Sequence, residues 1–173
     1  EIPENGIDDD DNGYVDDVYG WNFVGDNNDP MDDNGHGTHV AGIIGAANNG
    51  IGVTGVAYNC KVMPIKAGNS SGYFNNSDIA SAITYAYMNG ADVINMSFGN
   101  SMGPHDGSDV FSEAFSQLIE DYDIVVCCCA GNNSENNIVA KHTFTNEGES
   151  MKALFDLRES GNMISCYVAP KTS

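Results

Sequence analysis

The sequence has few basic residues and no long apolar run. Only 6 of its 173 residues are Lys or Arg, against 25 Asp or Glu, and the formal net charge is −19. We expect so acidic a surface to be repelled by nucleic acid and by anionic membrane surfaces. No stretch approaches the roughly 18 consecutive apolar residues of a membrane-spanning helix. The composition therefore argues against nucleic acid and membrane as partners and favours a globular domain.

Cysteine is too scarce and too unevenly placed for a disulfide framework. Five cysteines occur, Cys60, Cys166 and an adjacent run at 127–129. The count is odd, and neighbouring cysteines do not form the usual bridges. The run lies in the apolar segment IVVCCCAG, where cysteine behaves as a small apolar side chain. We expect these side chains to pack in the core rather than to take part in redox chemistry or metal binding.

Acidic residues are concentrated near the start of the sequence. Twelve of the 25 acids lie in the first 33 residues, and the first basic residue is Lys61. The stretch DDDDNGYVDD spaces oxygen-bearing side chains as in the first half of a Ca²⁺ loop, with Gly13 at the tight turn, although Tyr19 stands where the closing Glu belongs. A solvated acidic loop is the alternative, and residues 25–33 are a weaker second candidate. We expect a structural Ca²⁺ ion on Asp8, Asp10, Asn12, Asp16 and Asp17.

Beyond residue 35 the hydrophobic pattern alternates between two periods. A small-residue apolar stretch compatible with a helix covers 37–47, and helical spacing occurs over 75–90 and 108–122. Strand-like apolar runs occur over 60–68, 91–99 and 123–132. Strands that alternate with helices are typical of a parallel sheet covered by helices, which is an α/β fold. In such sheets functional groups gather at the carboxyl ends of the strands. Here those ends read KAGNSSG, NMSFGN and CAGNN.

Two histidines, His36 and His39, stand three residues apart in the stretch NGHGTHVAG. Zinc peptidases need a spacing of four and a Glu beside the first His, whereas Gly37 occupies that place here. The spacing therefore disfavours a metal pair. Two structural histidines remain possible, as does a catalytic base at a helix start flanked by glycines.

NGHGTHVAG closely resembles the histidine motif of the subtilisin-like serine proteases, the subtilases of peptidase family S8. The segment 52–99, which ends in VINMSFG, is similar to the strand, substrate-lining loop, helix and strand that follow in that family. IVVCCCAGN (124–132) is similar to the strand that carries the oxyanion asparagine. The resemblance covers residues 1–133 and implies a three-layer α/β fold, a parallel sheet flanked by helices, truncated at both ends. It divides the chain into an acidic lead-in (1–35), a family core (36–133) and a divergent segment (134–173).

The resemblance also implies roles for individual residues. His36 would be the general base, with His39 a structural neighbour facing the helix packing. Asn132 would donate its side-chain amide to the oxyanion. The backbone of Ser97, Phe98 and Gly99 would pair with an extended peptide and form one wall of the S1 pocket, with residues 68–73 as the opposite edge.

Two parts of the family's catalytic machinery are missing from these 173 residues. No Asp-Ser/Thr-Gly motif occurs, and no apolar strand precedes the acids at 8–11. No Gly-Thr-Ser-Met-Ala motif occurs either. Ser150 in GESMKALFDL follows Asn132 too closely, and Glu149 replaces the threonine. We therefore expect a piece of a serine endopeptidase that is inactive in isolation.

The alternative to a protease is a non-catalytic relative that binds peptide or Ca²⁺. By resemblance, the partner is a peptide or protein substrate, and the location is extracellular or secreted. The opening residues EIPENGIDDD have no signal-peptide character.

Overall fold

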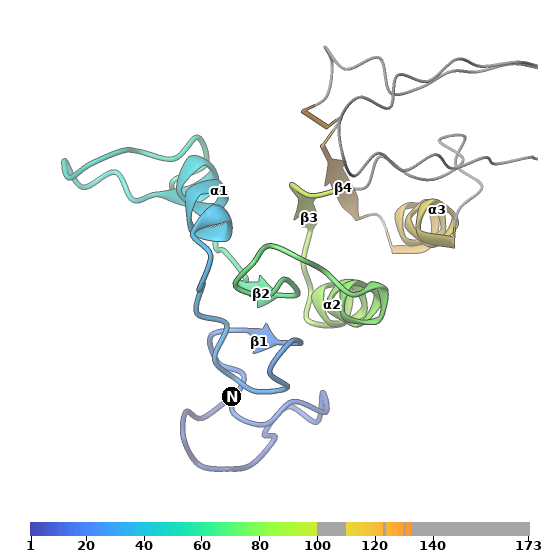
Figure 1. Ribbon diagram of the computed structural model, residues 1–173. Coiled ribbons are helices and arrows are strands. Elements are labelled where there is room, and N and C mark those ends of the chain that lie inside the picture. The colour runs from blue at the N-terminus through green and yellow to red at the C-terminus, as the bar shows by residue number, and fades with distance from the viewer. Residues whose placement is uncertain (100–109, 123, 130, 133–173) are drawn as a thin grey trace, which may run out of the picture.

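The computed structural model describes residues 1–99, 110–122, 124–129 and 131–132. Three helices and four short strands alternate along these ranges (Figure 1). Each predicted helix and each predicted strand is present, although the strands are shorter than predicted. In order, the elements are β1 (Trp21–Asn22), α1 (His36–Gly45), β2 (Ile65–Lys66), α2 (Asn76–Met88), β3 (Val93–Met96), α3 (Val110–Tyr122) and β4 (Val125–Cys128).

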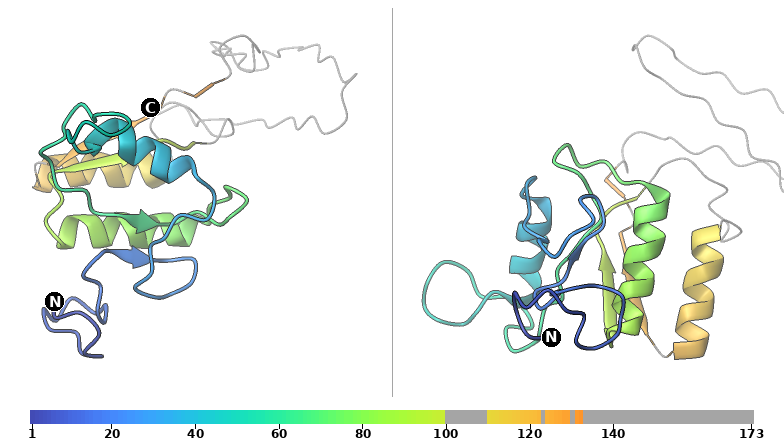
Figure 2. Two further views of the ribbon diagram at one scale, coloured as in Figure 1. Left: turned by 90° about the vertical axis from the view of Figure 1, so that its left-hand side faces the viewer. Right: turned by 90° about the horizontal axis from the view of Figure 1, so that it is seen from below.

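The strands pair in parallel. β1 pairs with β2, and β3 pairs with β4 in the register Val93 to Val125. The strands lie between α1 on one side and α2 and α3 on the other (Figure 2). The predicted α/β arrangement of a parallel sheet flanked by helices is therefore confirmed.

β2 is shorter than the predicted strand because Pro64 stands directly before it and has no N–H to donate to a neighbour. The residue before β1, Gly20, lies close to Pro64. A Cβ on Gly20 would lie 1.9 Å from the Pro64 carbonyl oxygen, and the φ angle of Gly20 is +104°. Glycine at position 20 is thus required for β1 to lie beside β2.

The main core lies between the β3–β4 pair and the helices α2 and α3. β3 alternates strictly, with Ile94 and Met96 buried and Val93 and Asn95 exposed, as expected for the two-residue period of a strand. Burial of each large apolar side chain stabilises the fold by about 1.5–3 kcal/mol. The buried members are Ile83, Ala86, Ile94, Met96, Leu118 and Ile124.

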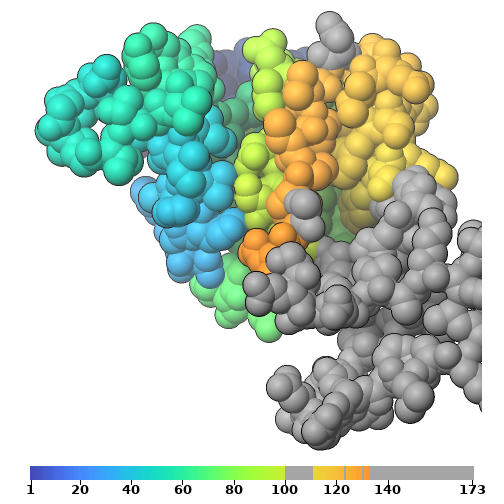
Figure 3. Space-filling model, turned by 90° about the horizontal axis from the view of Figure 1, so that it is seen from above, coloured from blue at the N-terminus to red at the C-terminus, as the bar shows by residue number. Residues whose placement is uncertain are grey.

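Two predictions about burial are wrong for the described residues. The run at 127–129 is exposed rather than packed in the core, because within the described ranges β4 pairs with β3 alone and lies at the surface (Figure 3). His39 is exposed as well, since α1 has no buried residue and no described element covers that face of the helix.

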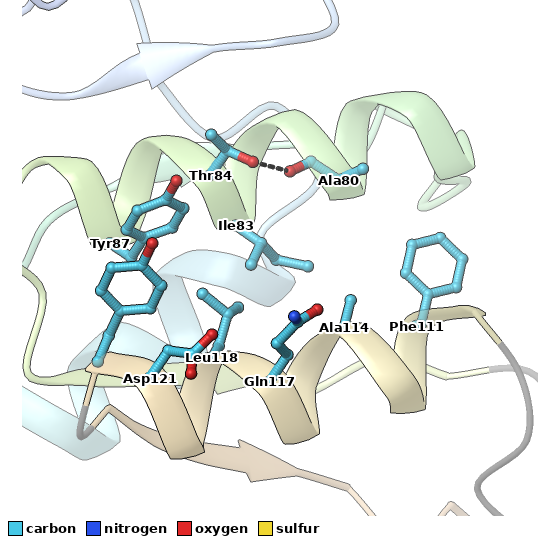
Figure 4. Close-up of a pocket in the computed structure, with 10 residues that line it drawn as sticks. Ala80, Ile83, Thr84, Tyr87, Phe111, Ala114, Gln117, Leu118 and Asp121 are labelled. Atoms are coloured by element: carbon cyan, nitrogen blue, oxygen red, sulfur yellow. Dashed lines mark hydrogen bonds between the residues drawn. The ribbon is translucent and has the colours of Figure 1, made fainter.

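A shallow groove of about 360 Å³ separates α2 from α3 (Figure 4). Ile83 and Leu118 line it, as do Tyr87 and Tyr122, whose ring centroids lie 4.8 Å apart. The groove contains none of the residues predicted to act on a substrate. Within the described ranges, no helix is both long enough and apolar enough to cross a membrane.

Candidate active site

His36 is the first residue of α1, and its side chain is exposed. The preceding residue, Gly35, has a φ angle of +99°, a left-handed conformation that glycine adopts without strain. The chain therefore turns sharply at Gly35 and starts the helix with the imidazole at its N-terminus. This is the accessible position that a general base needs.

Asp32 caps this helix although it lies outside it. Its Oδ1 accepts the backbone N–H groups of Asn34 and Gly35 at 2.9 Å each, and its Oδ2 accepts both the N–H and the hydroxyl of Thr38 at 2.7 Å. The Thr38 hydroxyl and these backbone amides hold the pKa of Asp32 well below its usual value. An acid at this place satisfies otherwise unpaired N–H groups of the first turn and complements the helix dipole.

The sequence analysis missed this role of Asp32. The available signal was an acidic residue just ahead of a helix start. Asp32 also lies in the weaker calcium candidate 25–33, but both of its carboxylate oxygens accept hydrogen bonds from Thr38 or from the two residues that precede α1.

The two residues after Asp32 anchor the same loop to other elements. Asp33 forms an ion pair with Lys66 of β2, whose side chain is only 11% exposed. The Asn34 side chain donates to the Ser70 carbonyl oxygen at 3.0 Å. The loop that presents His36 is thus fixed to β2 and to the predicted substrate loop 68–73.

The predicted substrate segment, residues 97–99, continues directly from β3. The Phe98 ring stacks on Phe74, which follows the loop 68–73, with centroids 4.2 Å apart and planes inclined by 19°. Across the sheet, the Cys129 thiol donates to the Phe98 carbonyl oxygen at 3.3 Å. The structure therefore brings together the two predicted edges of the substrate site through Phe74 and Phe98.

Asn132 is exposed and lies a few residues beyond β4, directly after Gly131, which has a φ angle of +87°. Because β3 and β4 run in parallel, their carboxyl ends meet at one edge of the sheet. This edge carries the predicted oxyanion donor and the predicted substrate segment. Ser150 and the rest of the divergent segment lie outside the described residues.

The acidic segment, residues 1–35, contains a compact group of three carboxylates. One oxygen each from Glu1, Asp8 and Asp10 lies within 4.8 Å of the others. Burial raises the pKa of Glu1, and its Oε2 atom is buried without a hydrogen-bond partner among the described residues. Partial burial also acts to raise the pKa of Asp8, but hydrogen bonds from the Gly13 and Asn12 amides bring it below its usual value. An unpartnered oxygen beside two further carboxylates fits a hard cation such as Ca²⁺.

The structure assigns other contacts to the remaining predicted calcium ligands. Asp16 accepts the backbone N–H groups of Asn5 and Gly6 at 2.9 and 3.0 Å. Asp17 is buried and accepts the Tyr85 hydroxyl at 2.6 Å and the Asn12 amide at 3.0 Å. Neither carboxylate joins the group of three, whereas Glu1, which the sequence analysis did not consider, does.

Similarity to known proteins shows to which family the chain belongs. The sequence model of the subtilase family matches residues 3–164. The chain belongs to the subtilase family. The match extends into the segment 134–173, which the sequence analysis treated as divergent.

Several known proteases are similar to this subtilase chain. It is 45% identical over 116 residues to subtilisin-like protease 1 of Plasmodium vivax, covering 66% of the chain and 17% of that protein. It is 52% identical over 81 residues to the cell wall-associated protease of Bacillus subtilis, covering 46% of the chain and 9% of that protein. It is 50% identical over 86 residues to subtilisin DY of Bacillus licheniformis, covering 50% of the chain and 31% of that protein. The subtilase chain thus spans less than a third of the length of these relatives.

Proposed function

We propose that the protein carrying this chain is a subtilisin-like serine endopeptidase. The observation that carries the proposal is the anchored position of His36, at the start of α1 and tied through Asn34 to the loop 68–73. Similarity to proteins named as subtilisin-like proteases supports the activity. No specific observation favours the non-catalytic alternative.

In this mechanism the residues of the chain supply three functions. The His36 imidazole takes the proton from the attacking serine hydroxyl and returns it to the leaving amine. The Asn132 amide donates to the oxyanion as negative charge develops on the substrate carbonyl. The backbone of Ser97–Gly99 pairs with an extended peptide in the manner of an added β-strand.

The substrate we propose is a peptide or protein, and the location is extracellular or at the cell surface. A relative named as a cell wall-associated protease supports this location. The net charge of −19 agrees with this substrate, because so acidic a chain is repelled by nucleic acid.

A fluorophosphonate probe, which labels only activated serines, tests the proposal. We expect the product of the complete gene to be labelled and to cleave an unstructured protein substrate. We expect no labelling of the 173-residue chain alone, because it contains neither the serine motif nor the aspartate motif of the family. A complete gene product that binds peptides but is neither labelled nor active would favour the non-catalytic binding module instead.

We further propose that Glu1, Asp8 and Asp10 hold a structural Ca²⁺ ion. The support is the grouping of their oxygens within 4.8 Å and the buried, unpartnered Oε2 of Glu1. A bound cation offsets the mutual repulsion of these carboxylates and stabilises the acidic segment by linkage to the folded state.

A further inference from the structure

The Cys129 side chain and backbone both contact the strand that leads into the substrate segment. The thiol donates to the Phe98 carbonyl oxygen, and the Cys129 N–H donates to the Met96 carbonyl oxygen, each at 3.3 Å. Among the described residues other than the chain neighbours of Gly99, the sulfur is the atom nearest to the place where a side chain on Gly99 would begin, at 3.7 Å. A single residue just beyond β4 therefore hydrogen-bonds to Met96 and Phe98 and lies beside the position of Gly99.

Phe98 is held from its other side as well. Its ring stacks on Phe74, and the Phe74 ring in turn lies over Gly68, 2.9 Å from where a Cβ would stand. In the part of the chain that the structure describes, no other donor reaches the Phe98 carbonyl oxygen. The ring of Phe98 is thus fixed by the loop side of the site and its carbonyl by Cys129.

We propose that Cys129 is a positioning residue for the substrate segment Ser97–Gly99, and that peptide binding is consequently sensitive to modification of its thiol. This inference rests on the proposed function, in which the backbone of this segment pairs with the peptide. A thiol is a weak donor, so its loss alone has a modest effect. An adduct on the sulfur removes the donated hydrogen and also adds volume beside Gly99. It should therefore weaken peptide binding more than the loss of the thiol does.

Methyl methanethiosulfonate is a suitable probe because Cys129 is exposed. The Cys129 thiolate attacks the sulfenyl sulfur of the reagent and forms a methyl disulfide. Methanesulfinate leaves with the electron pair of the broken S–S bond, and the thiol proton passes to solvent. The reaction is reversed by a reducing agent, which provides an internal control.

The variants C129A, C129S and C127A separate positioning from general packing in the complete gene product. For C129A we expect KM to rise about two- to fivefold with kcat unchanged, because a weak hydrogen bond is lost. C129S keeps a donor and is expected to restore the KM of the wild type. Cys127 lies in β4, is exposed and has no hydrogen bond from its side chain among the described residues, so C127A is the matched control and should leave KM unchanged.

Treatment with the probe should raise KM about tenfold or more in the wild type and in C127A, as expected for added volume in a fitted contact. It should leave KM of C129A unchanged. Equal KM values for the wild type and C129A, together with equal responses to the probe, would overturn the role of Cys129.

Failure of the proposed function gives a different result. A wild-type protein that neither cleaves peptides nor takes up the fluorophosphonate probe contradicts the protease assignment, whatever the cysteine variants do. Amide hydrogen exchange at residues 97–99 then tests Cys129 without activity. Faster exchange in C129A than in C127A supports the positioning role, and equal exchange in the two variants refutes it.

Discussion

The acidic segment and the core around α2, β3, α3 and β4 are held together by different interactions. The acidic segment has one two-residue strand and is fixed mainly by carboxylate and amide side chains that accept backbone N–H groups. The core is fixed by apolar side chains on facing elements. All non-glycine residues with left-handed backbone in the described ranges, Glu4, Asp11, Asp16 and Asp26, lie in the acidic segment.

The two regions should therefore respond to different perturbations. Carboxylate contacts depend on pH, salt and cations, whereas apolar packing depends chiefly on buried area. The regions meet at Tyr85 of α2. Its ring packs edge-on against Tyr14 at 4.9 Å, and its hydroxyl donates to buried Asp17, which is 6% exposed.

The largest effect is expected from a cavity in the core. Leu118→Ala removes a buried side chain of α3 and should lower the free energy of unfolding by about 2–5 kcal/mol. Ile119→Ala changes the next residue, which is 48% exposed, and should have a much smaller effect. Urea denaturation of the two variants measures the difference, and equal destabilisation would contradict the assigned core.

Calcium should act on the acidic segment alone. At a concentration about 100 times its dissociation constant, Ca²⁺ should raise the free energy of unfolding by about 2.7 kcal/mol, and a chelator should reverse the change. D8N and D10N should abolish the response. D11N changes the charge equally, and Asn tolerates the φ angle of 60° at that position, so it should retain the response. A melting temperature that does not depend on Ca²⁺ would exclude the site.

Breaking the contact between the two regions should have an intermediate effect. Y85F leaves the buried Asp17 carboxylate without the Tyr85 hydroxyl and should cost about 1–3 kcal/mol. Y87F is the control, since no described residue hydrogen-bonds to its hydroxyl. We expect faster hydrogen exchange in residues 1–20 of Y85F than of Y87F, and identical exchange would mean that this contact does not hold the acidic segment.

The effect of Y85F should also depend on pH. Burial, followed by the hydrogen bond to Asp17, raises the pKa of Tyr85 above its usual value. A group whose pKa is raised on folding contributes stability that is complete below the unfolded pKa of about 10 and is lost as pH rises through the folded pKa. The stability difference between wild type and Y85F should therefore be constant at neutral pH and shrink in strong alkali. Urea denaturation across that range measures it, and a difference that grew with pH would contradict the assigned contact.

The smallest effect is expected at the helix cap. D32A should cost about 0.5–2 kcal/mol at neutral pH, the usual range for a lost N-terminal cap. Because the pKa of Asp32 is lowered in the folded state, this stability is present above the unfolded pKa of about 3.9 and is lost as pH falls below it. D33A removes the exposed carboxylate of the ion pair with Lys66, whose own side chain is only 11% exposed, and leaves the hydrogen bonds of Asp32 at the start of α1 in place. Denaturation at pH 7 and pH 3 checks both variants, and an unchanged D32A difference at pH 3 would contradict the role of the carboxylate.

The sequence was sufficient for the order of the elements beyond residue 35 and for the family, because apolar periodicity and the motifs around His36 and Asn132 are local signals. It did not predict β1, which lies in the acidic segment. It was insufficient where contacts join distant residues. The capping of α1 by Asp32, the bond between Asp17 and Tyr85, and the membership of Glu1 in the carboxylate group all depend on tertiary structure. Burial of the run at 127–129 was predicted from the apolar segment around it, and this prediction fails because burial depends on the neighbours of a strand and not only on its own side chains.

His36 and His39 are assigned different roles, and variants of the two histidines distinguish these roles. In the complete gene product, H36A should reduce kcat/KM on a peptide substrate by roughly 10²–10⁴-fold or more, the usual contribution of a general base. H39A alters the other histidine of the same motif, which is exposed in α1, and should retain activity. Similar losses in both variants, or an active H36A enzyme, would contradict the assignment of His36 as the base.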